Sequence, residues 1–238
     1  MTEPGQVNCF YVEYQDSPVL DSAGELLTVL DEDDLARYHR YTHSEKKAEL
    51  LVSRLLVKSV MARFSGVLLQ DVVLWSAPGG EPRLEIKGGT KFHLPRFSLA
   101  HTHGLVAVAF YGHGEVGVDV EDMLDTRRHL EAIAFRFFSE QEKAYFHSDE
   151  NKTPTHFFTL WTLKEAIAKV QKGGILELLK DNLVVDGRVM DTKDAMYLEH
   201  QVLDEQYCFG IAVKGEKPRK PAEFTGISYA RLHENLHR

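Results

Sequence analysis

The sequence predicts an α+β fold made of two similar lobes. Strands, helices and a hairpin follow one another in a similar order in both halves of the chain, although no repeat is visible in the residues themselves. The turn Gly112-His113-Gly114 lies between the two halves. We therefore expect an N-terminal lobe over residues 1–113, a C-terminal lobe over 114–222 and a tail over 223–238.

The elements of the first half follow from residue periodicity and from capping signals. Asp31 is a good N-cap for a short helix that runs to Tyr38. The capping box Thr42-His43-Ser44-Glu45 opens the longest helix, which ends near Gly66. The turn Pro78-Gly79-Gly80 separates two short strands. The expected strands are 7–14, 72–76 and 83–86, followed by a hairpin of 97–101 with 105–111.

The second half begins with an acidic strand at Val116 and continues with helices. Ser139 and Glu142 form a capping box. A central helix is expected from Thr153, its N-cap, to Lys172, with Gly173 and Gly174 as a left-handed stop. After it come a strand at 182–185 that leads to the turn Asp186-Gly187, a hairpin from 196 to 213 and a charged linker from 214 to 221.

The central helix places two lysines and one glutamate beside an apolar stripe. Phe157, Leu160, Leu163, Ile167 and Val170 recur at helical spacing and should face the core. Three charged residues lie off that stripe, namely Lys164, Glu165 and Lys169. Glu165 and Lys169 are four residues apart, so the bland interpretation is an ordinary surface ion pair. The alternative is that these charged residues belong to a functional site.

The acidic strand carries a candidate metal site. Side chains alternate along a strand, so Gly117, Asp119 and Glu121 share one face. Two carboxylates two residues apart can reach one ion, and Mg²⁺ prefers one or two carboxylates with phosphate and water. Gly117 leaves room beside them. The alternative is a strand end that runs into a solvated acidic turn, which Glu121, Asp122 and Asp125 would fit.

Composition narrows the class of protein. The 238 residues, with 43% hydrophobic and 27% charged residues, are typical of a globular chain with a sizeable core. A formal net charge of −8 argues against a nucleic-acid surface. Cys9 and Cys208 are isolated thiols without metal or disulfide spacing, which favours a reducing compartment. With neither a membrane-length apolar run nor a signal sequence, we expect a cytoplasmic protein that binds no membrane.

Together, the acidic strand and the central helix resemble the 4'-phosphopantetheinyl transferases of the longer Sfp type. The residues that carry the resemblance are Gly117-Val118-Asp119-Val120-Glu121 and Trp161-Thr162-Leu163-Lys164-Glu165-Ala166-Ile167-Ala168-Lys169. Between them, Arg136-Phe137-Phe138-Ser139 and Glu142 resemble the family's linking segment. The resemblance implies two α+β lobes related by pseudo-twofold symmetry, with the active site in the cleft between them.

The resemblance also implies a reaction and its metal. Members transfer the 4'-phosphopantetheine arm of coenzyme A to a serine of an apo acyl or peptidyl carrier protein, releasing adenosine 3',5'-bisphosphate. Asp119, Glu121 and Glu165 match the family's ligands for Mg²⁺, with Mn²⁺ as an alternative ion. Glu165 also matches the proposed base, and Lys169 matches the lysine that steadies or protonates the leaving phosphate. Trp161 is expected to pack, and the longer members are usually monomers.

The resemblance implies further residues for coenzyme A. Lys164 would add positive charge near the phosphates, and Lys169 would contact them. Arg54 resembles a helix arginine that meets the 3'-phosphate. His101 matches a histidine that contacts the phosphates, although His103 is an equal candidate from sequence alone.

Three positions depart from the family's pattern. Glu81 replaces a lysine in Gly-Lys-Pro, Ala100 replaces a serine, and Lys172 replaces a glycine. They bear on coenzyme A binding more than on the metal site. Two other functions therefore stay open, namely a carrier-binding module that has lost turnover and an unrelated Mg²⁺-dependent phosphohydrolase.

Overall fold

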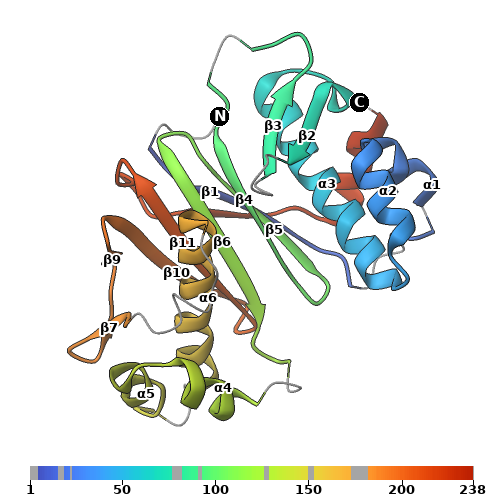
Figure 1. Ribbon diagram of the computed structural model, residues 1–238. Coiled ribbons are helices and arrows are strands. Elements are labelled where there is room, and N and C mark those ends of the chain that lie inside the picture. Colours follow the sequence, from blue (N-terminus) through green and yellow to red (C-terminus); the bar gives the residue numbers. More distant parts are fainter. Residues whose placement is uncertain are drawn as a thin grey trace. The chain divides into compact units, whose positions relative to one another are not determined.

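The chain forms two compact units, each with its own sheet and its own long helix. The computed structural model describes residues 5–15, 19–21, 23–76, 82–90, 93–125, 129–149, 153–172 and 182–237. One unit comprises Met1–Gly112 together with Glu223–Arg238, and the other comprises His113–Ala222. The structure is therefore of mixed α and β type with two separate groups of strands (Figure 1). No helix in the described ranges is both long and apolar enough to cross a membrane.

The first unit is built on a four-stranded sheet in the order β12-β1-β5-β4. Strand β5 lies between β1 and β4 and is antiparallel to both, while β12 runs parallel to β1. All seven residues of β5 are buried, so this strand lies at the centre of the unit. The strands are β1 (Asn8–Glu13), β4 (Arg96–Thr102), β5 (Leu105–Tyr111) and β12 (Glu223–Gly226), beside a separate hairpin of β2 (Val72–Ser76) with β3 (Pro82–Ile86).

The long helix α3 supplies much of the core of the first unit. Leu51, Leu55 and Leu56 are fully buried within it. It ends where Gly66 takes a left-handed conformation, as expected. Its start differs from the prediction, since the N-cap is His43 and no side chain caps it, whereas Asp31 does cap the helix before it. The helices are α1 (Ala23–Leu26), α2 (Glu32–Arg40), α3 (Ser44–Ser65) and α8 (Tyr229–Glu234), with 3-10 turns at Leu27–Val29, Leu69–Asp71 and Asn235–His237.

The C-terminal segment is part of the first unit. Strand β12 adds to β1, and Leu232 on α8 is fully buried in the core. Residues from both ends of the chain thus complete one sheet. The charged segment before it, from Lys214 to Pro221, belongs to the second unit, where β11 extends to Gly215.

The second unit is built on the sheet β6-β11-β10-β9, against which helix α6 packs. The strands are antiparallel to their neighbours, and β6 carries the acidic segment. The elements are β6 (Gly114–Asp122), α4 (Leu130–Phe137), α5 (Glu140–Phe146), α6 (Thr153–Gln171), β7 (Val184–Val185), β8 (Arg188–Val189), β9 (Thr192–Lys193), β10 (Met196–Leu203) and β11 (Tyr207–Gly215).

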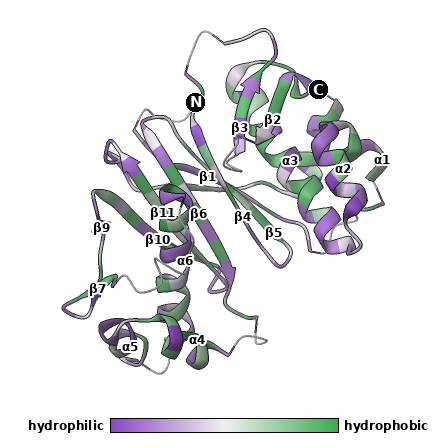
Figure 2. Cartoon of the chain, viewed as in Figure 1, coloured by the Kyte–Doolittle hydropathy of each residue, from purple (hydrophilic) through white to green (hydrophobic). Residues whose placement is uncertain are grey.

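Helix α6 is more deeply buried than a single apolar stripe predicts. The predicted stripe is buried, but Phe158, Thr162 and Ala166 are fully or almost fully buried as well. Hydrophilic residues interrupt the hydrophobic surface of the helix (Figure 2). It ends at Gln171, and Lys172 rather than a glycine takes the left-handed conformation with φ of 56°. Gly173, Gly174 and the turn Pro78-Gly79-Gly80 lie outside the described residues.

Two glycines let the backbone of α6 approach the sheet closely. A Cβ atom at Gly117 on β6 would collide with the carbonyl oxygen of Ala166, and one at Gly210 on β11 would collide with the backbone of Thr162. The room beside Gly117 is therefore filled by α6, rather than left for the carboxylates as the sequence suggested. The same contact shows that the face of β6 shared by Gly117, Asp119 and Glu121 is the face that α6 covers.

A buried ion pair joins α6 to α5. The ammonium of Lys164 lies 2.9 Å from Oε1 of Glu142, and the two side chains are 1% and 0% exposed. Glu142 also completes the predicted capping box, since its Oε2 accepts from the backbone N–H of Ser139 at 2.8 Å. Its Oε1 accepts a further bond from the N–H of Leu183 at 2.9 Å. One carboxylate thus holds the start of α5, the middle of α6 and the segment that leads to β7.

We expect Lys164→Met to lower the free energy of unfolding by about 3–5 kcal/mol, because it leaves a buried carboxylate without its cation. Glu142→Gln should also destabilise, and the double variant should lose less than the sum of the two single changes. Urea denaturation of the four proteins measures this. Lys143→Met is the control, because Lys143 pairs with the exposed Glu140 and its loss should cost less than about 1 kcal/mol. Wild-type stability of Lys164→Met would contradict the expectation.

Candidate active site

The two carboxylates of the acidic strand lie buried between the sheet and α6. Asp119 and Glu121 are each 8% exposed, and they share the face of β6 that the helix covers. The pKa of the Cys208 thiol on the neighbouring strand is raised to about 11, mainly by burial and in smaller part by the negative charges of Asp119 and Glu121. The strand thus continues as a buried ladder, and the two acids are not part of a solvated turn.

Asp122 fits the acidic-turn interpretation instead. Its Oδ1 accepts a hydrogen bond from the N–H of Leu124 at 2.9 Å, which stabilises the turn that follows β6. By strand alternation it lies on the face opposite to Asp119 and Glu121. The run of acids therefore divides into a turn residue and a buried pair.

Lys169 crosses from α6 to β6. Its Nζ atom donates to Oδ1 of Asp119 at 3.0 Å and to the carbonyl oxygen of Val118 at 2.7 Å. The side chain is 32% exposed, so its ammonium lies at the edge of the buried region. Two motifs separated by 50 positions in the chain thus meet through one ion pair.

The electrostatics of Asp119 bring Glu165 into the same group. The pKa of the Asp119 carboxyl is raised to about 6, mainly by burial and to a smaller extent by the negative charge of Glu165. Lys169 lowers that pKa through its charge and its hydrogen bond. Asp119, Glu165 and Lys169 therefore form one interacting cluster of two acids and one base.

The cluster has the chemistry that a hard divalent cation requires. Among the described residues, Oδ2 of Asp119 is a buried carboxylate oxygen with no hydrogen-bond partner. An orphaned buried charge of this kind is costly and indicates a missing ligand. No three ligating side chains in the described ranges are grouped tightly enough to hold a metal by themselves. Mg²⁺ does not need such a cage, because substrate phosphates and water supply most of its ligands.

Lys164 pairs with a carboxylate outside this cluster. The ammonium that was expected near the phosphates is engaged by Glu142 and is 1% exposed. A side chain this buried contributes to the fold of the unit. Trp161, expected to pack, stacks on Phe157 with ring centroids 5.9 Å apart.

The first unit holds the other residues predicted to bind coenzyme A. Arg54 on α3 makes a two-pronged contact with Asp34 on α2, in which Nε donates to Oδ2 and Nη2 donates to Oδ1 at 2.8 Å. A carboxylate thus already occupies two of the donors that were expected to meet a phosphate. The contact fastens α2 to α3.

The two hairpin histidines remain equivalent in the structure. Nε2 of His101 lies 3.1 Å from Oε1 of Glu49, and Nδ1 of His103 lies 2.8 Å from Oε1 of Glu45. Both glutamates belong to α3, and both imidazoles are more than 40% exposed. The geometry therefore does not separate His101 from His103.

Sequence reasoning missed the partners of these residues. Asp34 and Glu142 carry no signal that pairs them with Arg54 and Lys164, which follow 20 and 22 positions later. The carbonyl of Val118, which accepts from Lys169, is a backbone group and has no sequence signal at all. Each partner depends on packing between elements.

Comparison with known proteins supports one family. Residues 115–211, which include the whole cluster, match the model of the 4'-phosphopantetheinyl transferase superfamily. The chain is 27% identical to the 4'-phosphopantetheinyl transferase Sfp of Bacillus subtilis over 93% of its own length and 98% of that relative. It is 29% identical to the 4'-phosphopantetheinyl transferase HetI of Nostoc over 80% of its length and 81% of that relative.

A third relative aligns over a shorter stretch. The chain is 32% identical to a putative 4'-phosphopantetheinyl transferase of Synechocystis, over 62% of its own length and 58% of that relative. The family model and the relatives agree, and the matched segment carries the Asp119, Glu165 and Lys169 cluster. The chain is therefore similar to the 4'-phosphopantetheinyl transferase superfamily, and in particular to its Sfp-type members.

Proposed function

We propose that this protein transfers 4'-phosphopantetheine from coenzyme A to a serine of an apo acyl or peptidyl carrier protein, with Mg²⁺ or Mn²⁺. The observation that carries the proposal is the contact between Lys169 and Asp119, with Glu165 beside them. It joins the two motifs on which the resemblance depends. A monomer that acts in the cytoplasm, and a pseudo-twofold relation between the lobes, remain predictions of the sequence.

Asp119, Glu121 and Glu165 would hold the metal ion, which supplies positive charge to the pyrophosphate of coenzyme A. The unpartnered Oδ2 of Asp119 is the oxygen best suited to this role. Its Oδ1 is already held by Lys169, so the carboxylate keeps a fixed orientation on β6. The buried setting strengthens each of these electrostatic interactions relative to water.

Glu165 would act on the attacking serine hydroxyl, and Lys169 would act on the leaving group. The serine oxygen forms a bond to phosphorus, and the bond from that phosphorus to the bisphosphate leaving group breaks. Glu165 accepts the serine proton, directly or through water. Lys169 balances the charge that develops on the leaving phosphate, and its partial exposure lets the ammonium reach a ligand.

The transfer is tested by intact-mass spectrometry of a panel of apo carrier proteins incubated with this protein, coenzyme A and Mg²⁺. We expect one phosphopantetheine to be added to at least one carrier, and EDTA to prevent the addition. Protein that is folded and binds Mg²⁺ but modifies no carrier would favour a module without turnover. Release of bisphosphate from coenzyme A without any carrier would instead indicate a hydrolase.

Asp119→Asn and Glu165→Gln should each lower the transfer rate by about 10²-fold or more, because each removes a charge from the proposed metal site at nearly constant volume. Single-turnover rates and Mg²⁺ titrations measure the effect. Glu115→Gln is the matched control, since it removes a carboxylate from the same strand and should stay near the wild-type rate. Wild-type turnover of Asp119→Asn in metal-defined buffer would refute the proposed role.

Lys169→Met should lower the transfer rate by about 10-fold or more while Mg²⁺ binding is kept. The carboxylates remain in this variant, and Oδ1 of Asp119 loses a competing cation. Calorimetric titration with Mg²⁺ and the transfer assay are carried out on the same preparation. Lys172→Met removes the same charge three residues further on and is the control. An unchanged rate in Lys169→Met would leave Lys169 with a purely structural role.

A further inference from the structure

The side chains of the first unit that were expected to meet the phosphates of coenzyme A are each paired with a carboxylate. Arg54 on α3 uses both prongs of its fork for Asp34 on α2, and both side chains are largely buried. Nε2 of His101 on β4 lies 3.1 Å from Oε1 of Glu49 on α3. A 3'-phosphate would therefore meet cationic groups that the unit already uses for itself.

Glu49 is held at both of its carboxylate oxygens. Its Oε1 atom faces His101, and its Oε2 atom accepts a hydrogen bond from Nζ of Lys46 at 2.7 Å. The side chain of Glu49 is 16% exposed, whereas that of Glu45, the partner of His103, is 57% exposed. Glu49 is thus the more firmly fixed of the two glutamates that face the hairpin histidines.

The charge around these pairs is unfavourable for a further anion. The pKa of Tyr14 is raised above its ordinary value mainly by burial, and in smaller part by the negative charges of Glu49 and Glu45. With neutral imidazoles, the three carboxylates of these pairs outnumber their two permanent cations, Arg54 and Lys46. A phosphate monoester carries a charge of about −1.5 to −2, so it would meet charge of its own sign here.

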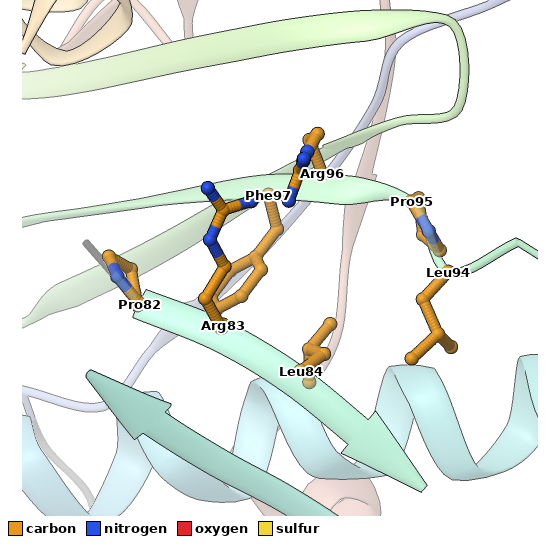
Figure 3. A pocket seen from close by; sticks show the side chains of 7 residues that line it. All are labelled: Pro82, Arg83, Leu84, Leu94, Pro95, Arg96 and Phe97. Atoms are coloured by element: carbon orange, nitrogen blue, oxygen red, sulfur yellow. The ribbon is translucent and has the colours of Figure 1, made fainter. Parts of the chain in front are cut away.

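A pocket between β3 and the start of β4 does not take over this role (Figure 3). Its volume is about 50 Å³, whereas pockets for drug-sized ligands typically measure about 300–1,000 Å³. It is therefore too small to enclose a nucleotide, and its two arginines already make contacts of their own. Its lining residues are Pro82, Arg83, Leu84, Leu94, Pro95, Arg96 and Phe97.

Two positions of the sequence point in the same direction. Glu81 stands where the family's pattern has a lysine, and Ala100, beside His101, stands where it has a serine. Each replacement removes a group that can bind phosphate, and Glu81 adds a negative charge. Glu81 lies outside the described residues, so its support comes from the sequence alone.

We propose that Asp34 and Glu49 are specificity-determining residues that keep Arg54 and His101 in internal pairs, so that the chain accepts 3'-dephospho-coenzyme A nearly as well as coenzyme A. This inference rests on the proposed function. With either donor, the serine oxygen forms a bond to the same phosphorus, and the serine proton leaves as in the transfer proposed above. The bond that breaks releases adenosine 3',5'-bisphosphate from coenzyme A and adenosine 5'-monophosphate from the dephospho form. The carrier gains the same arm in both cases.

The first test compares the two donors on the unaltered protein. Calorimetric titrations in the presence of Mg²⁺ give the two dissociation constants, and the transfer assay gives kcat/KM for each donor. A phosphate held by an arginine fork typically contributes about tenfold or more in affinity. We expect the two donors to differ by less than about fivefold in both readouts, and a larger preference for coenzyme A would overturn the proposal.

Asp34→Asn removes the charge that faces Arg54 at nearly constant volume, and it should raise the preference for coenzyme A to about tenfold or more. Adding Arg54→Gln to this variant should cancel the gain, which a merely structural effect of Asp34 would not produce. Asp33→Asn is the matched control, because it removes an exposed acid from the same helix and should keep the preference of the parent.

Glu49→Gln is a second variant that leaves the contact between α2 and α3 in place. It should also raise the preference for coenzyme A, by about threefold or more, because His101 loses a competing anion. Thermal denaturation identifies the variants that are folded. An unchanged preference in Glu49→Gln, or in folded Asp34→Asn, would overturn the role of that acid.

The outcomes separate this inference from the proposed function. Transfer from coenzyme A without binding of the dephospho form would overturn the inference on specificity and leave the transfer reaction standing. Binding of neither donor by the folded protein would overturn both proposals. The titrations need no carrier protein, so an unsuitable carrier does not affect them.

Discussion

The close packing of the α6 backbone on β6 and β11 is the constraint on which the structure of the second unit depends. Gly117 and Gly210 let the helix backbone reach the sheet, and any side chain there would push it away. At this separation the Lys169 ammonium meets both the carboxylate of Asp119 and the carbonyl of Val118. A backbone contact without chemistry of its own thus sets the geometry of the charged cluster.

The two lysines of α6 lie in different surroundings on one helix. Lys164 and Lys169 are five residues apart and therefore project from different sides of the helix. Lys164 is sealed against Glu142 with almost no exposure, whereas Lys169 is about one-third exposed. A fully buried pair is costly to disturb, and a partly exposed one can exchange partners with a ligand. The same residue type therefore occupies two different environments on one element.

Regular patterns in the sequence were sufficient for most of the fold. The acidic strand at Val116, the capping box at Ser139 and the stripe of α6 all depend on local patterns, and the structure confirms them. Local patterns could not predict which partner a charge would find. The pairs of Arg54 with Asp34 and of Lys164 with Glu142 arise from packing between elements, as does the filling of the space at Gly117.

The first unit raises the same question of partners for its arginines. An arginine whose planar fork meets a carboxylate fixes the spacing of the two elements that carry the pair. Arg54 does this, because both prongs of its contact go to Asp34 and join α3 to α2. The sequence pattern places Arg54 on a helix, but the packing of α2 on α3 decides which residue it meets. The partner on the neighbouring element, more than residue type or helix position, therefore determines what this arginine does.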